Sequence, residues 1–288
     1  MDMLHELITL ALHASLLLLA LGIGLDAGTG DVLFVLRRPR LLLRAMLAVV
    51  VVVPLVAVLL VALLPLDQQV ETAIVLMAVS PLPPIVLSKE IRSGGRKDYA
   101  YGLLVAAGAL SIVTVPAAVA ILAAVFDVHA AVSPLAVAQL VFVSLFLPLG
   151  IGMGLRALAP GPAVRAAPVV GKLALGLMGL ALLPVLLTAA PELARLIGNG
   201  AVLVMVAAVL AGLAAGHLLG GPEPQERIAL ALSSATRHPG IAMLIAGANA
   251  YGSEVRAAIL LFVVVGLLAA IPYQLWLRRH VLAPHRNA

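Results

Sequence analysis

The stretch "SSATRHPGIAMLIA", residues 233–246, interrupts an apolar segment with Arg237, His238, Pro239 and Gly240. Proline removes a backbone hydrogen-bond donor and crowds the preceding turn, and glycine loosens the backbone further. We therefore expect the helix to break here and to restart at Pro239, because proline is favoured at the first helical position. A charge at the centre of a membrane helix costs about 2.5–3.5 kcal/mol on insertion scales. Arg237 therefore needs a partner, water or a bound anion to compensate its charge.

The composition places the whole chain in a membrane. Its 288 residues are 63% hydrophobic and only 11% charged, whereas a soluble domain carries about 25% charged residues. Repeated apolar runs of about 20 residues are each long enough to cross a bilayer as a helix, and they lack the alternation of β-barrel strands. The expected fold class is therefore an all-α polytopic membrane protein. The sequence contains no cysteine, which excludes disulfides, thiolate metal sites and cysteine nucleophiles.

Nine membrane spans are expected, joined by short linkers. Their approximate ranges are 4–25, 41–64, 70–87, 99–126, 134–154, 168–189, 199–220, 226–250 and 254–276. The first is interpreted as a retained helix rather than a signal peptide, because the N-terminal residues carry no lysine or arginine. Lysine and arginine gather in alternate linkers, above all 26–44 and 88–98. This pattern predicts an outside N-terminus and a cytoplasmic C-terminus in the inner or plasma membrane, and no nucleic-acid partner.

A second interruption lies in the third span, where "AVSPLPPIVLSK" places Pro81, Pro83 and Pro84 within four residues. Three prolines so close should unwind the helix, and unwound backbone at bilayer depth must face protein or a water-filled cavity. The third and eighth spans are five apart, so they run in opposite directions. We therefore predict inverted repeats: residues 1–126 with four spans and the first helix absent, and residues 127–288 with five. Paired breaks of this kind indicate the binding site of a secondary transporter, with two simple proline kinks as the alternative.

Three segments of the sequence resemble the bile acid:sodium symporter family. "LLLLALGIGLDAGTGDVLFVLRRPRLLLRAMLAVVVVVPL" is similar to the second and third helices of that family, whereas "AVSPLPPIVLSK" and "ATRHPGIAMLIA" sit at its two crossing helices. The resemblance covers essentially the whole chain. It implies a nine-helix form in which a core domain, containing the two crossing helices, lies beside a panel domain. It also implies alternating access and an organic-anion substrate.

In that family, oxygen ligands around the two crossings hold sodium. Matched outward from Pro81 and Gly240, the ligand positions fall on Val86, Leu87, Ser233 and Arg237, and near Gly102 and Ala106. These side chains offer few oxygen atoms and one repelling cation, so the sodium-ligand pattern is largely lost. No metal or cofactor is expected. The proton is left open as the coupling ion, through His238, because histidine titrates near physiological pH.

The candidate substrate-binding residues are the polar and helix-breaking residues of the two breaks, with one threonine on the next span. They are Ser80, Pro81, Pro83, Pro84, Ser88, Thr114, Ser233, Ser234, Thr236, Arg237, His238, Pro239 and Gly240. Arg237 is interpreted as a structural brace of the crossing, as a contact for a substrate carboxylate, or as a snorkelling side chain at a misplaced boundary. The half-helix that starts near Pro239 has free N–H groups that favour an anion. Alternatively, His238 is a neutral side chain bonded to a freed carbonyl, and the hydroxyls bond their own backbone.

The predicted function is secondary active transport of an organic anion, with the anion and the lipid bilayer as partners. The alternatives are a sodium-coupled symporter with shifted ligands, a channel lined by the broken helices, and a non-transporting receptor on the same fold. An enzyme is not expected, because no H-E-x-x-H motif is present and every Asp and Glu falls near an expected span end. Glycine pairs such as Gly24–Gly28 and Gly150–Gly154 predict close helix packing.

Overall fold

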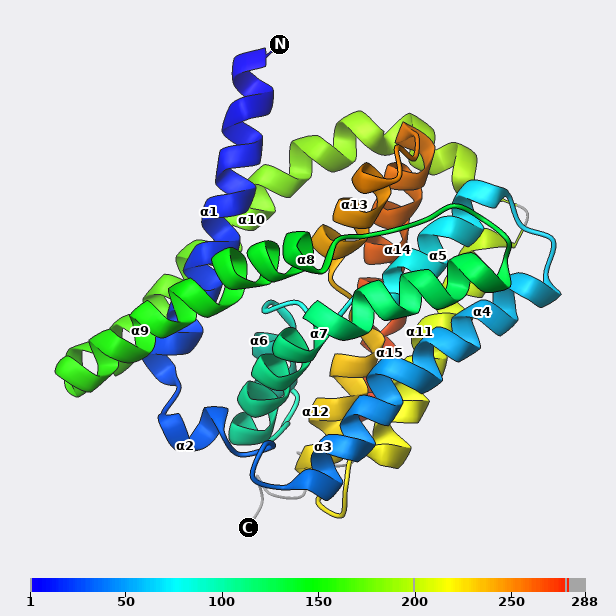
Figure 1. Ribbon diagram of the computed structural model, residues 1–288. Coiled ribbons are helices and arrows are strands. Elements are labelled where there is room, and N and C mark those ends of the chain that lie inside the picture. The colour runs from blue at the N-terminus through cyan, green and yellow to red at the C-terminus, as the bar shows by residue number, and fades with distance from the viewer. Residues whose placement is uncertain (1, 199, 278, 280–288) are drawn as a thin grey trace.

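The computed structural model describes residues 2–198, 200–277 and 279 of the chain, and they form helices joined by short turns (Figure 1). The first residue of the expected span 199–220 lies outside the described residues, as do residues 278 and 280–288 at the end of the second expected repeat. The elements are α1 (Asp2–Asp26), α2 (Thr29–Val32), α3 (Pro39–Met46), η1 (Leu47–Val52), α4 (Val53–Leu63), α5 (Gln68–Val79), α6 (Val86–Arg92), α7 (Lys97–Val125), α8 (Pro134–Val141), η2 (Phe142–Phe146), α9 (Leu147–Leu158), α10 (Pro160–Leu196), α11 (Ala201–Leu219), α12 (Pro224–Ala235), α13 (Pro239–Ala248), α14 (Ser253–Ala269) and α15 (Ile271–Leu277).

The fold class is confirmed, because the described residues contain eight helical segments that are long and apolar enough to cross a membrane. Eight of the nine expected spans correspond to these segments. The exception is the expected span 70–87, which is divided into the 12-residue α5 and the short α6. The division coincides with the three prolines, each of which lacks the N–H group that a continuous helix would use.

One group of helices lies on one side of the molecule, where α1 packs along both α9 and α10 (Figure 1). The 37-residue α10 contains three internal prolines and is visibly curved, as expected where carbonyls lose their helical donors. Gly24 of α1 and Gly152 of α9 bring the two backbones together: a Cβ on Gly152 would lie 2.5 Å from the Leu21 carbonyl oxygen. Small residues at this contact let two membrane helices approach closely.

The predicted glycine pairs are only partly correct. Gly24 makes a close helix contact, whereas a Cβ on Gly28 would meet side-chain atoms of Asp31 and Arg156 rather than another helix. The prediction is wrong for Gly150 and Gly154, which have open space around them. The reason is their position on the helix, because Gly152, halfway between them, is the residue that points toward α1.

A second group contains both broken helices, with α11 packed along α12 and α14 packed along α5. The contact between α11 and α12 depends on Gly212, Gly216 and Gly220, which are spaced four residues apart and therefore share one helix face. A Cβ on Gly216 would lie 2.5 Å from the Cα atom of Ala231. Backbone-to-backbone packing thus fixes the position of α12, the helix that leads into the second break.

Three of the linkers rich in lysine and arginine meet at one end of the molecule. Lys97 forms an ion pair of 2.8 Å with Asp26, and Arg156 donates a hydrogen bond to the carbonyl oxygen of Asp26. The guanidinium groups of Arg38 and Arg96 both lie over the ring of Phe34. This clustering agrees with spans that alternate in direction. The side of the membrane on which this end lies stays a prediction.

Candidate functional site

Both expected breaks are present. Helix α5 ends at Val79, the backbone is extended at Ser80, and α6 begins only at Val86. Helix α12 ends at Ala235, and α13 begins at Pro239 after a short extended segment. In each case the local sequence explains the interruption, because proline blocks the continuing helix at the first break and starts the new helix at the second.

The two breaks contact each other directly. The backbone N–H of His238 donates a hydrogen bond of 2.9 Å to the carbonyl oxygen of Pro81. The Nη1 atom of Arg237 donates a bond of 3.2 Å to the carbonyl oxygen of Ser80. The polar backbone groups of each break are thus hydrogen-bonded by residues of the other break, as a membrane interior requires. We call the place where the two breaks meet the crossing.

Arg237 also bonds a third segment of the chain. Its Nη1 donates to the carbonyl oxygen of Val49 at 3.1 Å. Val49 lies in the π-helical turn η1, where the usual donor would be the residue five positions later, and Pro54 at that position has no N–H. The carbonyl of Ser80 precedes Pro84 by four residues and lacks its helical donor for the same reason. Arg237 therefore supplies a donor for two carbonyls that prolines leave unpaired.

These bonds use only part of the Arg237 side chain. The residue is 4% exposed, and its Nε and Nη2 atoms have no hydrogen-bond partner in the described part of the chain. A buried cation with unused donors is costly unless something else compensates it. The bracing interpretation of Arg237 thus has structural support, and two donor atoms remain for a further acceptor.

A cavity of about 390 Å³ lies between the crossing and the group formed by α1 and α10. The crossing contributes Pro83, Thr236, Arg237, His238, Pro239 and Gly240 to its lining. The opposite wall is apolar, with Leu12 and Leu16 from α1 and Met178 and Leu182 from α10. This volume lies within the range of roughly 300–1,000 Å³ that is typical of ligand pockets.

Arg237 lines a second, much smaller cavity of about 20 Å³ together with Ser80, Pro81 and Thr114. Such a space holds about one water molecule. The remaining candidate site residues, Pro84, Ser88, Ser233 and Ser234, line neither of these two cavities.

Three of the six candidate hydroxyl groups bond backbone carbonyls three or four residues before them. Ser80 donates to the carbonyl of Leu76 at 2.7 Å, and Thr236 donates to the carbonyl of Leu232 at 2.8 Å. Ser88 likewise bonds the carbonyl three residues before it. These bonds are typical of hydroxyls in membrane helices. Ser233 differs, because its hydroxyl donates to the carboxyl group of Glu90 on α6.

Three polar residues near the crossing were not among the predicted site residues. Lys89 and Ser15 line the larger cavity, and Glu90 is fully buried. Lys89 and Glu90 were assigned to a linker because the third span was expected to end at residue 87, whereas α6 continues to Arg92. A helix that is interrupted at residues 80–85 must restart beyond them. The three prolines therefore indicate that Lys89 and Glu90 belong to the helix that follows the break.

The expectation of free N–H groups at the start of α13 is wrong. The N–H of Gly240 donates to Nδ1 of His238 at 3.1 Å, and the N–H groups of Ile241 and Ala242 donate to the His238 carbonyl. His238 is thus the N-terminal cap of α13. Because Nδ1 accepts a hydrogen bond, the ring is neutral in this conformation. The ring was expected to donate to a freed carbonyl, whereas here Nδ1 accepts from a backbone N–H.

We expect His238→Ala to lower the free energy of unfolding by about 1 kcal/mol, because it removes a helix cap. His238→Asn should retain nearly all of the stability, since asparagine is among the best capping residues. Thermal unfolding of the purified variants in the same detergent would measure both effects. Equal destabilisation by alanine and asparagine would contradict the capping role.

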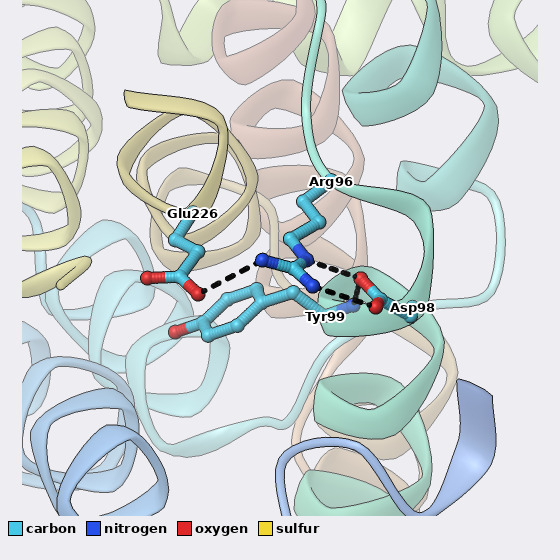
Figure 2. Close-up of polar contacts among 4 residues, drawn as sticks. All are labelled: Arg96, Asp98, Tyr99 and Glu226. Atoms are coloured by element: carbon cyan, nitrogen blue, oxygen red, sulfur yellow. Dashed lines mark hydrogen bonds and ion pairs between the residues drawn. The ribbon is translucent and has the colours of Figure 1, made fainter. Parts of the chain in front are cut away.

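A polar cluster occupies the arginine-rich end of α7 and α12. Arg96 donates two hydrogen bonds to Asp98, at 2.7 and 3.1 Å, and forms an ion pair of 3.7 Å with Glu226. The hydrogen bonds to Asp98 raise the pKa of Arg96 above its ordinary value. Figure 2 shows the ring of Tyr99 extending beside the carboxyl group of Glu226. The turn before α7 is also tied to α12 by a bond from the Arg96 N–H to the Gln225 carbonyl.

Four of the six positions matched to the sodium ligands lie in apolar packing, whereas Ser233 and Arg237 make the polar contacts described above. Val86 and Leu87 are buried in the hydrophobic core, and Ala106 is buried as well. Gly102 packs closely against the backbone of Val35. The described residues contain no group of three or more His, Cys, Asp or Glu side chains that could hold a metal ion. Val86, Leu87, Gly102 and Ala106 have no side-chain oxygen atom with which to bind a sodium ion.

Residues 13–195, more than half of the chain, match the Sodium Bile acid symporter family. The chain belongs to this family. The part that matches the family includes the first break and ends before the second. A search of curated proteins found no match. The family consists of transporters, which is the broad class that the sequence predicts, and the chain is a multi-pass member of it.

Proposed function

We propose that the protein is a secondary transporter of an amphipathic organic anion, and that the anion binds in the cavity of about 390 Å³ beside the crossing. One observation carries this proposal: Arg237 is buried at the meeting point of the two breaks and lines the cavity, and two of its donor atoms have no partner among the residues that the structure describes. A carboxylate can accept bonds from two guanidinium nitrogens at once, which gives both geometry and affinity.

The rest of the cavity supports an amphipathic rather than a small polar anion. Lys89 adds a second positive charge to the lining, while most of the other residues are apolar. Charge–charge attraction is stronger in such a low-dielectric space than in water. An apolar substrate body would gain by leaving water for the α1 and α10 wall.

The remaining parts of the proposal follow from the sequence pattern. Residues 1–126 and 127–288 form the inverted repeats, the N-terminus lies outside, and access to the cavity alternates between the two sides of the inner or plasma membrane. Sodium dependence is not proposed, because five of the six matched ligand positions carry side chains without an oxygen atom. No enzymatic activity is proposed.

A thermal-shift screen of purified protein tests the binding site. The ligands are carboxylates of increasing apolar size, such as acetate, benzoate, phenylpropionate and a steroid carboxylate, each with and without sodium. We expect the larger carboxylates to raise the unfolding temperature independently of sodium. A ligand at 100 times its Kd stabilises the folded state by about 2.7 kcal/mol. Stabilisation that requires sodium would favour the symporter with shifted ligands.

The best-binding carboxylate is then used to test transport in liposomes. Saturable uptake that is accelerated by unlabelled carboxylate on the opposite side is expected of a carrier. Single-channel conductance would contradict the proposal in favour of a pore. Tight binding without any flux would contradict it in favour of a receptor.

A further inference from the structure

A buried carboxyl group lies close to the crossing and plays no part in the proposed anion site. Glu90 on α6 is 0% exposed, and its Oε1 accepts a hydrogen bond from the hydroxyl of Ser233 on α12. Its Oε2 is buried without a hydrogen-bond partner among the described residues. Ser233 precedes Arg237 by four residues, so the carboxyl contact lies about one helical turn from the point where the breaks meet.

No lysine or arginine nitrogen in the described part of the chain lies within 4.0 Å of the Glu90 carboxyl group. Lys89 is its neighbour on α6 and lines the cavity of about 390 Å³ beside α1. From α7 the nearby titratable group is Tyr99, which also lies within electrostatic range of Glu226 on α12. Arg96, in the turn before α7, is engaged by Asp98 and Glu226. A buried carboxylate with one hydroxyl donor and no paired cation is poorly compensated, and a bound proton removes its charge.

A set of polar atoms leads from Glu90 toward the arginine-rich end. The Tyr99 hydroxyl is buried and lies within electrostatic range of both Glu90 and Glu226. Glu226, which lies beside the Tyr99 ring in Figure 2, lines a cavity of about 920 Å³ together with Arg38 and Arg40. We expect water to reach Glu90 from this cavity, because Glu90 does not line the cavity of about 390 Å³ beside α1.

We propose that Glu90 is the proton-binding group through which this protein couples anion transport to protons. A proton from water adds to Oε2 of the carboxylate and gives a neutral carboxylic acid, and it returns to water when that acid ionises. The inference rests on the proposed function, because the anion compensates Arg237 while the proton compensates Glu90. With both ligands bound, neither the Arg237 guanidinium nor the Glu90 carboxyl group carries an uncompensated charge, so we expect one proton to move with each anion.

Infrared difference spectroscopy of the protein in lipid nanodiscs tests the proton-binding step without any substrate. Acidification is expected to produce the carbonyl band of a buried carboxylic acid. The band should be absent in Glu90→Gln and present in the control Glu192→Gln, which removes an exposed carboxyl group of α10. A spectrum that is identical in wild type and E90Q would overturn the proposal. Sodium that removes the band at constant pH would also overturn it, because the carboxylate would then hold sodium.

A second measurement tests the coupling. Binding of phenylpropionate or the best carboxylate of the thermal-shift screen is followed in weakly buffered detergent solution with a pH indicator dye. We expect about one proton to be taken up per carboxylate bound by wild type and by E192Q, and none by E90Q. Glu90→Asp should restore the uptake, which guards against a folding defect in E90Q. Binding without proton uptake would overturn this inference and leave the proposed function intact, whereas a lack of binding by every carboxylate would overturn the proposed function itself.

Discussion

Replacing Arg237 with glutamine is expected to weaken carboxylate binding by about 30-fold or more and to abolish uptake. The guanidinium group is the most deeply buried cation of the cavity lining, and two of its donors are unused by the part of the chain that the structure describes. Removing one partner of a buried charge pair costs about 2–5 kcal/mol, and about 1.4 kcal/mol corresponds to a tenfold change in affinity. Titration of the thermal shift with carboxylate would measure the change in Kd.

The bracing bonds of Arg237 require a separate control, because their loss also lowers stability. Arg237→Lys keeps a positive charge but cannot form a bidentate contact, so it should bind with intermediate affinity. Arg195→Gln removes an exposed arginine at the end of α10 and should leave affinity unchanged. If R237Q lowered the unfolding temperature and still bound carboxylate with wild-type affinity, Arg237 would be a brace only.

Replacing Gly216 with alanine should strongly destabilise the protein, although alanine is the better helix former. The added Cβ would overlap the Leu230 carbonyl and lie 2.5 Å from the Cα atom of Ala231. Because these are backbone atoms, α11 and α12 would have to separate. Overpacking of this kind costs about 1–3 kcal/mol, and more where the backbone cannot yield. Thermal unfolding in a fixed detergent, or resistance to proteolysis, would report the loss.

Gly150→Ala is the matched control, since it makes the same substitution in a membrane helix with open space around it. It should be neutral or stabilise the protein by up to about 1 kcal/mol through helix propensity. Equal stability of G216A and G150A would contradict the close backbone contact between α11 and α12 at Gly216.

The positions of the breaks could be predicted from sequence because proline and glycine act locally. The same reasoning predicted that Arg237 would need compensation. It could not find the cavity, because helices such as α1 and α10 are apolar around their whole circumference and their periodicity does not separate lipid-facing from protein-facing sides. Only the assembled structure shows that Leu12 and Met178 face the crossing.

Other parts of the site were missed because they depend on contacts between distant segments. The free carbonyl of Val49 depends on Pro54 and on a π-helical turn, and its donor comes from a residue far along the chain. In the sequence, Glu90 is an ordinary charged residue after an apolar stretch. Its role in the site becomes visible only when the structure places Ser233 opposite it. By contrast, the four-residue spacing of Gly212, Gly216 and Gly220 was visible in the sequence and would have predicted the contact between α11 and α12.

The hydrogen bond between His238 and Pro81 restricts how the protein moves. Because main-chain atoms of both breaks are joined there, with Arg237 adding a bond to Ser80, the crossing cannot separate into halves without stranding polar groups in a dry interior. In the proposed transport cycle, the two broken helices would therefore open the cavity by moving along the apolar wall formed by α1 and α10. The two broken helices would then move as one rigid unit, and the bound anion would move with them.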